Sequence, residues 1–114
     1  MEKPTRYYSN LQETEVAEVL WGEKVKNSGG NPTKKGDVII KRDDYSILLE
    51  CKTKVKPCKS FSIKREWIED NRKDALANRH DFSGIVINFG GEEQDNHILL
   101  SLKDFKNIIL LEGE

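Results

Sequence analysis

The sequence contains few residues of the kinds that hold small secreted or zinc-bound domains together. Only two cysteines, Cys51 and Cys58, and two histidines occur in 114 residues, which is too few for a disulfide framework or a typical zinc site. No apolar run approaches the roughly 18–20 residues that a membrane-spanning helix needs. The first ten residues, MEKPTRYYSN, lack the apolar centre of a signal peptide. These absences predict a soluble, cytoplasmic protein in a reducing compartment, with no membrane partner and no small-molecule cofactor.

Length and charge predict one small domain with an uneven charge distribution. We expect a single domain over residues 1–114, with residues 1–8 as a flexible arm. The formal net charge is only −1, yet the segment from Lys24 to Arg65 holds 12 Lys and Arg against 4 Asp and Glu. The rest of the chain holds 7 against 16. Because phosphate binding depends on local cations, this separation favours DNA binding by the basic segment over a merely solvated charged surface.

Two apolar runs separated by a charged break predict a β-hairpin from Gly36 to Lys52. With Asp43 and Asp44 at the turn, counting back along both strands places Asp37 directly opposite Glu50. Side chains alternate across a strand, so Glu50 and Lys52 share one face, while Cys51 takes the other face as a buried thiol.

Like charges directly opposite on a sheet repel each other, which favours a cation between Asp37 and Glu50. Hard oxygen ligands suit Mg²⁺, with Mn²⁺ able to substitute. Lys52, two residues on and on the same face, adds a positive charge beside the metal. Two carboxylates, a metal ion and a lysine suit the hydrolysis of a phosphodiester. The alternative is a surface hairpin with scattered charge.

The first helix offers a third acidic residue. Ser9-x-x-Gln12 is typical of a capping box and predicts a helix that begins there and ends near Trp21. Glu13 falls on the apolar stripe of this helix, which favours a ligand role, although a carboxylate is also favoured near a helix N-terminus. Glu13, Glu15 or Glu18 could complete the acidic cluster, and we take Glu13 as the candidate.

The remaining pattern predicts a mixed set of strands and helices. A short strand is expected within residues 23–26, followed by a glycine-rich loop over 27–35. Ser62 is expected to cap a helix from Ile63 to Asn78. A buried central strand over 82–89 and an edge strand over 97–102 follow, and residues 104–111 form a helix or a last strand.

The hairpin motif and its flanking segments resemble a known family. Asp37 followed by Glu50-Cys51-Lys52 resembles the D…(D/E)-x-K signature of the PD-(D/E)XK nuclease superfamily. The segments Asn27–Gly30, Lys34–Asp37 and Phe61–Lys64 are similar to those of phage and archaeal-type Holliday junction resolvases. Gly36 replaces the proline that often precedes the first Asp, a position that varies widely. The resemblance covers roughly residues 9–90.

This resemblance implies an α/β fold with a restriction-endonuclease-like mixed sheet flanked by helices, in the order α-β-β-β-α-β-β. It implies a Mg²⁺-dependent hydrolase, an endodeoxyribonuclease that resolves four-way DNA junctions during recombination. Asp37, Glu50, the main-chain carbonyl of Cys51 and Glu13 would bind the metal, and Lys52 would act beside it. The expected DNA contacts are Ser28, Lys34, Lys35, Lys54, Ser62 and Lys64.

Paired symmetric nicks imply a homodimer with two active sites. The expected location is the cytoplasm, or the host cytoplasm if a phage encodes the protein. Three alternatives remain open at this point: a related nuclease for another DNA structure in restriction, repair or flap cleavage, a non-catalytic DNA-binding module, and a toxin or ribonuclease.

Overall fold

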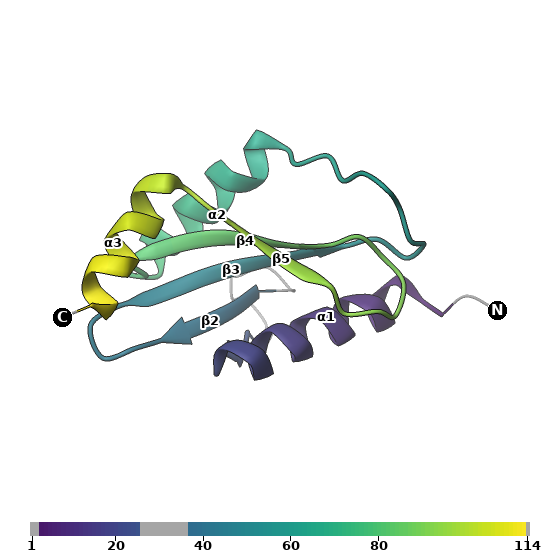
Figure 1. The fold of residues 1–114 in the computed structure, drawn as a ribbon, viewed down its shortest axis with the longest axis horizontal. Coiled ribbons are helices and arrows are strands. Elements are labelled where there is room, and N and C mark those ends of the chain that lie inside the picture. Colours follow the sequence, from purple (N-terminus) through teal and green to yellow (C-terminus); the bar gives the residue numbers. More distant parts are fainter. Residues whose placement is uncertain (1–2, 26–36, 114) are drawn as a thin grey trace.

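The protein is described by a computed structural model that covers residues 3–25 and 37–113 (Figure 1). Within these ranges the chain forms one five-stranded sheet with helices packed against it. The elements, in chain order, are α1 (Thr5–Leu20), β1 (Glu23–Lys24), β2 (Asp37–Lys41), β3 (Ser46–Thr53), α2 (Arg65–Ala77), β4 (Phe82–Asn88), β5 (Asn96–Leu100) and α3 (Leu102–Glu112). The expected α/β class with a mixed, helix-flanked sheet is confirmed, and α3 is added to the expected order.

The strands lie in the order β1-β2-β3-β4-β5, so neighbours in sequence are also neighbours in the sheet. Only β3 and β4 are parallel, because the chain between them crosses through α2, whereas the other pairs are antiparallel. The hairpin register is the expected one: Asp37 pairs with Glu50, and the Arg42 amide donates to the Tyr45 carbonyl across the turn at 2.8 Å.

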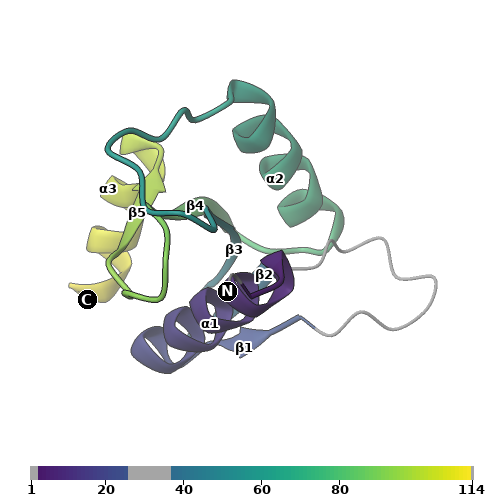
Figure 2. The same cartoon turned by 90° about the vertical axis from the view of Figure 1, so that its right-hand side faces the viewer.

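The core lies on both faces of the two central strands. Leu48 and Leu49 of β3, and Ile85 and Val86 of β4, are all buried, as expected for strands covered on both sides. Helices α1 and α2 pack on opposite faces of the sheet (Figure 2). The α1 face carries the main apolar cluster, in which Val16 packs with alternate residues of β2 and β3.

Helix α1 begins four residues earlier than its capping pattern predicts. It starts at Thr5 after Pro4, so Thr5 to Tyr8 belong to the helix and the expected flexible arm over residues 1–8 is wrong there. Tyr8 is buried against the domain, and this packing extends the helix toward the N-terminus. Gln12 does not act in a capping box. It is buried and donates through Nε2 to the carbonyls of Lys52 at 2.9 Å and Val86 at 3.2 Å.

The start of α2 also differs from the expectation. Lys64, not Ser62, precedes the first turn, and no side chain caps it. Phe61 packs edge-on against Trp67 and Phe89, with 6.2 Å between ring centroids in each pair. These contacts hold the preceding segment against the domain in a non-helical conformation, which overrides the capping preference of Ser62.

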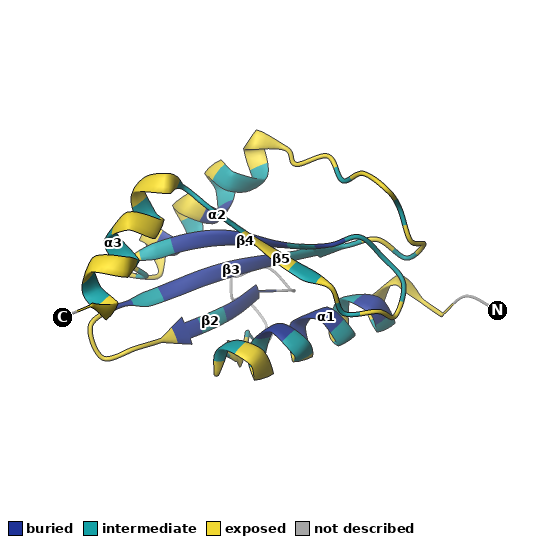
Figure 3. Cartoon of the chain, in the orientation of Figure 1, coloured by how far each residue is buried: buried dark blue, intermediate teal, exposed yellow. Residues whose placement is uncertain are grey.

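The C-terminal part forms the open edge of the sheet. Within the described residues β5 pairs only with β4, so the expected edge strand is confirmed, although it ends at Leu100. Ser101 caps α3 by accepting a hydrogen bond from the Asp104 amide at 3.0 Å, which settles residues 104–111 as helix. Much of this edge and helix is exposed to solvent (Figure 3). The exposed residues include five large apolar ones: Ile98, Leu102, Phe105, Ile109 and Leu110.

Candidate metal and nucleic-acid site

Asp37 and Glu50 form a buried pair of carboxylates on neighbouring strands. Asp37 opens β2 and Glu50 lies in the middle of β3, where the ladder pairs them directly. Their exposed fractions are only 1% and 4%. Two acidic side chains placed opposite each other and buried carry both a repulsion and a desolvation cost. The fold therefore concentrates negative charge at this point, as the hairpin pattern predicts.

Lys52 places an ammonium group beside this pair. It follows Glu50 by two residues in β3, so the strand alternation puts both side chains on the face that α2 covers. The Lys52 Nζ lies 3.7 Å from Glu50 Oε2, and it also lies 4.7 Å from the centroid of the Trp67 ring in α2. The Lys52 side chain keeps about a third of its surface exposed, at 34%, and so remains reachable from solvent.

Glu13 reaches the site region from the other face of the sheet. It lies on α1, which packs against the face that carries Val38 and Leu49, whereas Asp37 and Glu50 alternate onto the opposite face. Glu13 is 7% exposed. Burial raises the pKa of its carboxyl above the ordinary value, and the charges of Lys24 and Arg6 oppose this shift.

The Cys51 thiol follows Glu50 directly in β3 and is close enough to the acidic groups to respond to their charge. Burial is the main cause that raises its pKa, and the negative charges of Glu13, Asp37 and Glu50 raise it further. Cys51 is half-buried and packs against the apolar cluster, so the expected buried thiol is found in part. The three carboxylates thus act electrostatically on one residue of β3.

The described residues do not assemble a three-residue metal site. Among residues 3–25 and 37–113, no group of three or more His, Cys, Asp or Glu side chains lies close enough to hold a metal ion. Asp37 and Glu50 are brought together as a pair, and Glu13 does not join them in such a group. Its role as a ligand stays a prediction.

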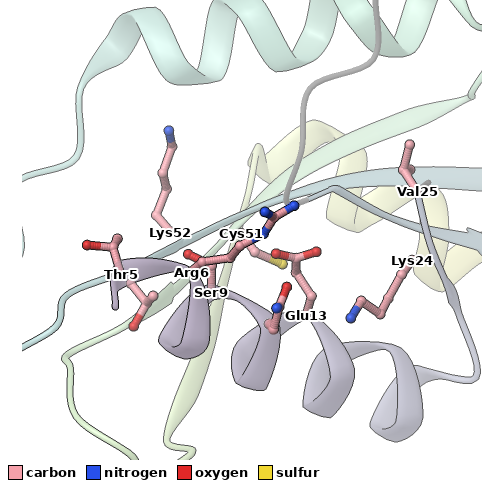
Figure 4. A pocket seen from close by; sticks show the side chains of 10 residues that line it. Thr5, Arg6, Ser9, Glu13, Lys24, Val25, Cys51 and Lys52 are labelled. Atoms are coloured by element: carbon pink, nitrogen blue, oxygen red, sulfur yellow. The ribbon is translucent and has the colours of Figure 1, made fainter. Parts of the chain in front are cut away.

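A polar cleft of about 620 Å³ opens beside α1 (Figure 4). Figure 4 shows Glu13 next to Cys51 in this cleft, while the Lys52 side chain points away from it toward α2. The cleft is lined by Thr5, Arg6, Ser9, Asn10, Glu13, Lys24, Val25, Cys51, Lys52 and Thr53.

Arg6 was missed as a site residue because residues 1–8 were read as an arm. The signal was present in the spacing, since Arg6 precedes Glu13 by two helical turns and shares its stripe once the helix extends to Thr5. The sequence therefore predicts the acid of this cleft but neither of the two cations that act on it, Lys24 and Arg6.

The expected DNA-contacting residues fall into two groups. Ser28, Lys34 and Lys35 lie outside the described residues. Lys54 and Lys64 lie on the α2 side, where each ammonium is near an aromatic ring: Lys54 Nζ is 5.3 Å from the Phe61 centroid, and Lys64 Nζ is 5.9 Å from the Trp67 centroid. Ser62, two residues before Lys64 in the chain, is exposed. Strand β3 stops at Thr53, so Lys54 lies just beyond its end.

Beyond Glu50, the ladder between β2 and β3 ends. Cys51, Lys52 and Thr53 pair with β4 on one side, but the described part of β2 does not extend alongside them. On the β2 side, the main-chain groups of β3 beyond Glu50 thus lie next to the carboxylate pair and outside the described ladder. This placement is compatible with a main-chain carbonyl serving as a third oxygen ligand.

No family model, curated protein or solved structure matches this chain. None of the helices in the described ranges is long and apolar enough to cross a membrane.

Proposed function

We propose that this protein is a metal-dependent DNA endonuclease of the PD-(D/E)XK type that resolves four-way junctions. The observation that carries the proposal is the buried Asp37–Glu50 pair with the Lys52 ammonium 3.7 Å from Glu50. A fold gains no stability from two buried, opposed carboxylates. Their placement is accounted for when a cation binds there.

The donor set fits Mg²⁺ or Mn²⁺, because hard divalent cations prefer carboxylate and carbonyl oxygens. Asp37, Glu50 and the Cys51 carbonyl would hold the metal, with Glu13 as a further candidate that approaches from α1. When bound, the metal would supply Lewis-acid stabilisation of charge on a phosphate group.

Lys52 is the residue that acts on the phosphate from the protein side. Its ammonium carries three N–H donors, which can orient an attacking water and stabilise the charge that develops on the phosphoryl oxygens. Glu50 and Lys52 are adjacent on one face of the sheet. The lysine would therefore contact the same phosphate that a metal held by the carboxylates would bind. Lys54 and Lys64 lie farther out on this side and would contact neighbouring phosphates.

Resolving a four-way junction requires two nicks, and each chain carries one set of Asp37, Glu50 and Lys52. We therefore propose a two-fold dimer whose interface uses the open edge of β5 and the exposed apolar side of α3. Ile98, Phe105 and Ile109 are half-exposed or more, at 50%, 50% and 53%, and a second copy would bury them.

The test of catalysis is a cleavage panel with a labelled four-way junction, matched duplex, single-stranded DNA and RNA, each with and without Mg²⁺. Asp37→Asn and Glu50→Gln should abolish cleavage of the junction and retain DNA binding. Asp43→Asn, in the exposed hairpin turn, is the matched control and should cut at the wild-type rate. A wild-type rate for Asp37→Asn with Mg²⁺ contradicts the assignment.

The same panel separates the alternatives. Preference for a flap or a specific duplex indicates a nuclease for another DNA structure, and RNA cleavage indicates a ribonuclease. Binding without cleavage by any metal indicates a non-catalytic module.

The dimer is tested by light scattering at micromolar protein, with and without the junction. Phe105→Asp should give a monomer, whereas Lys106→Asp, the exposed neighbour on another side of α3, should remain a dimer. A wild-type monomer under both conditions contradicts paired nicking and favours a single-strand nicking enzyme.

A further inference from the structure

Trp67 lies on α2, and its indole ring lies close to the Lys52 ammonium. The Lys52 Nζ lies 4.7 Å from the ring centroid, within the range of a cation–π interaction. The same ammonium lies 3.7 Å from Glu50 Oε2. Lys52 is therefore held between a carboxylate on its own strand and an aromatic ring from the helix above.

A lysine side chain has a flexible four-carbon stem, so an ammonium with one contact samples many positions. A second contact from a different element restricts that freedom. The ring face directs the ammonium from the helix side, and the carboxylate directs it from the strand side. Together they keep the Lys52 Nζ close to the Asp37–Glu50 pair.

The indole itself is fixed by its surroundings. Phe61 meets Trp67 edge-on with centroids 6.2 Å apart, and Phe61 in turn meets Phe89, which follows β4. The Lys64 Nζ lies 5.9 Å from the Trp67 centroid. Because α2 packs against β3 and β4, the orientation of the indole is set by the fold and does not depend on a bound ligand.

We infer that Trp67 is a positioning residue that holds the Lys52 ammonium against the carboxylate pair. The effect of Trp67 on a reaction rests on the proposed nuclease function, whereas the contact between Trp67 and Lys52 is independent of that function. Without the indole, the Lys52 ammonium should be free to move away from Glu50. The expected defect is in the rate of cleavage and not in DNA affinity.

The contact is tested first without any reaction. Ring currents of an indole shift the protons of a lysine side chain above its face upfield in an NMR spectrum. The Lys52 side-chain Hε resonances should lie upfield in the wild type and move to ordinary positions in Trp67→Leu. Trp21→Leu is the matched control, because Trp21 is 81% exposed and no described lysine lies over its ring.

A reciprocal variant keeps this test decisive if Trp67→Leu fails to fold. In Lys52→Met, which removes the cation from a partly exposed side chain, the Trp67 indole resonances should shift while those of Trp21 stay unchanged. Lys52 resonances at ordinary positions in the wild type, or an unchanged Trp67 signal in Lys52→Met, would overturn the inference.

The kinetic arm uses single-turnover cleavage of the junction at saturating Mg²⁺. Trp67→Leu should lower the rate constant about tenfold or more, with junction affinity within about twofold of wild type, because a misplaced catalytic group costs rate. Trp67→Phe, which keeps a weaker aromatic face, should recover part of the rate. Trp21→Leu should cut like the wild type.

The outcomes separate the two proposals. If the wild-type protein and Asp37→Asn both fail to show Mg²⁺-dependent cleavage, the nuclease proposal fails and the NMR arm decides the position of Lys52. If the wild type cleaves and Trp67→Leu cleaves equally fast, the inference is overturned while the nuclease stands. Weaker junction binding with an unchanged rate would also overturn it, by making Trp67 a DNA contact.

Discussion

Replacing Glu13 by Gln should stabilise the folded protein at neutral pH. Burial raises the pKa of the Glu13 carboxyl in the folded state, whereas the unfolded chain has the ordinary value near 4.5. The folded state therefore binds the Glu13 proton more tightly than the unfolded state does. Stability falls as the pH rises from 4.5 through the folded-state pKa, and below 4.5 the penalty disappears because both states are protonated.

The size of the effect follows from the separation of the two pKa values. Each unit of separation corresponds to about 1.36 kcal/mol of unfolding free energy. For a domain of roughly 100 residues, 1 kcal/mol shifts Tm by about 4 °C or more. Glu13 is only 7% exposed, so solvent screens the penalty little, although Arg6 and Lys24 reduce it. Gln keeps the shape and the polar atoms and removes the charge, so Tm should rise at pH 7.5 and stay nearly unchanged at pH 4.

The assay is thermal unfolding followed by circular dichroism at pH 4, 5.5 and 7.5, in EDTA so that no divalent cation binds. Glu18→Gln is the matched control, since Glu18 is exposed on the same helix and its substitution should change Tm little at any pH. A gain for Glu13→Gln that is equal at pH 4 and pH 7.5 would show that packing, not charge, causes it. No gain at pH 7.5 would refute the reasoning outright.

Three further predictions concern a buried hydrogen bond, a half-buried histidine and DNA binding. Gln12→Leu removes the donor to the Lys52 and Val86 carbonyls and should cost about 1–3 kcal/mol in urea unfolding, while Asn10→Leu on the exposed side should cost little. Burial lowers the pKa of His80 below 6.5, so the contribution of His80 to stability should rise with pH up to about 6.5, and His80→Asn should remove this contribution from the pH dependence measured by denaturation. Replacing Lys54 and Lys64 together by Ala should flatten the salt dependence of junction binding by up to about two units, at about 0.9 per lost phosphate contact; an unchanged slope would remove both lysines from the contact surface.

The hairpin could be predicted in detail because its register depends on local information. The period of two along each apolar run and the short charged turn leave one pairing that keeps Val38 and Leu49 inward. That register alone placed Asp37 against Glu50. The buried central strand was predicted for a similar reason, since a continuous apolar run without alternation leaves few other positions in a small sheet.

The helix starts could not be predicted, because tertiary contacts decided them. Ser9 and Gln12 fit a capping box locally, but Tyr8 and Gln12 bury against the sheet and extend the helix to Thr5. Ser62 fits a helix cap, but the contacts of Phe61 delay the helix to Arg65. The face of the sheet that Glu13 approaches also depends on which side α1 packs, and nothing local in the sequence specifies that side.

Under the proposed function, the acidic and basic groups around β3 would have different roles toward a polyanionic substrate. The carboxylates of Asp37 and Glu50 are buried, where they would repel a phosphate unless a cation neutralised them. The ammonium groups of Lys52, Lys54 and Lys64 lie outside them on aromatic rings, where they remain available to a phosphate. Under the proposed function, the buried acids would bind a cation and the outer ammonium groups would bind phosphate, so DNA would bind best once the metal is in place. Junction affinity should accordingly rise on adding Ca²⁺, which fits the same oxygen ligands. This gain should be lost in Asp37→Asn, because the variant has one carboxylate fewer to repel the phosphate and a metal has less charge to neutralise.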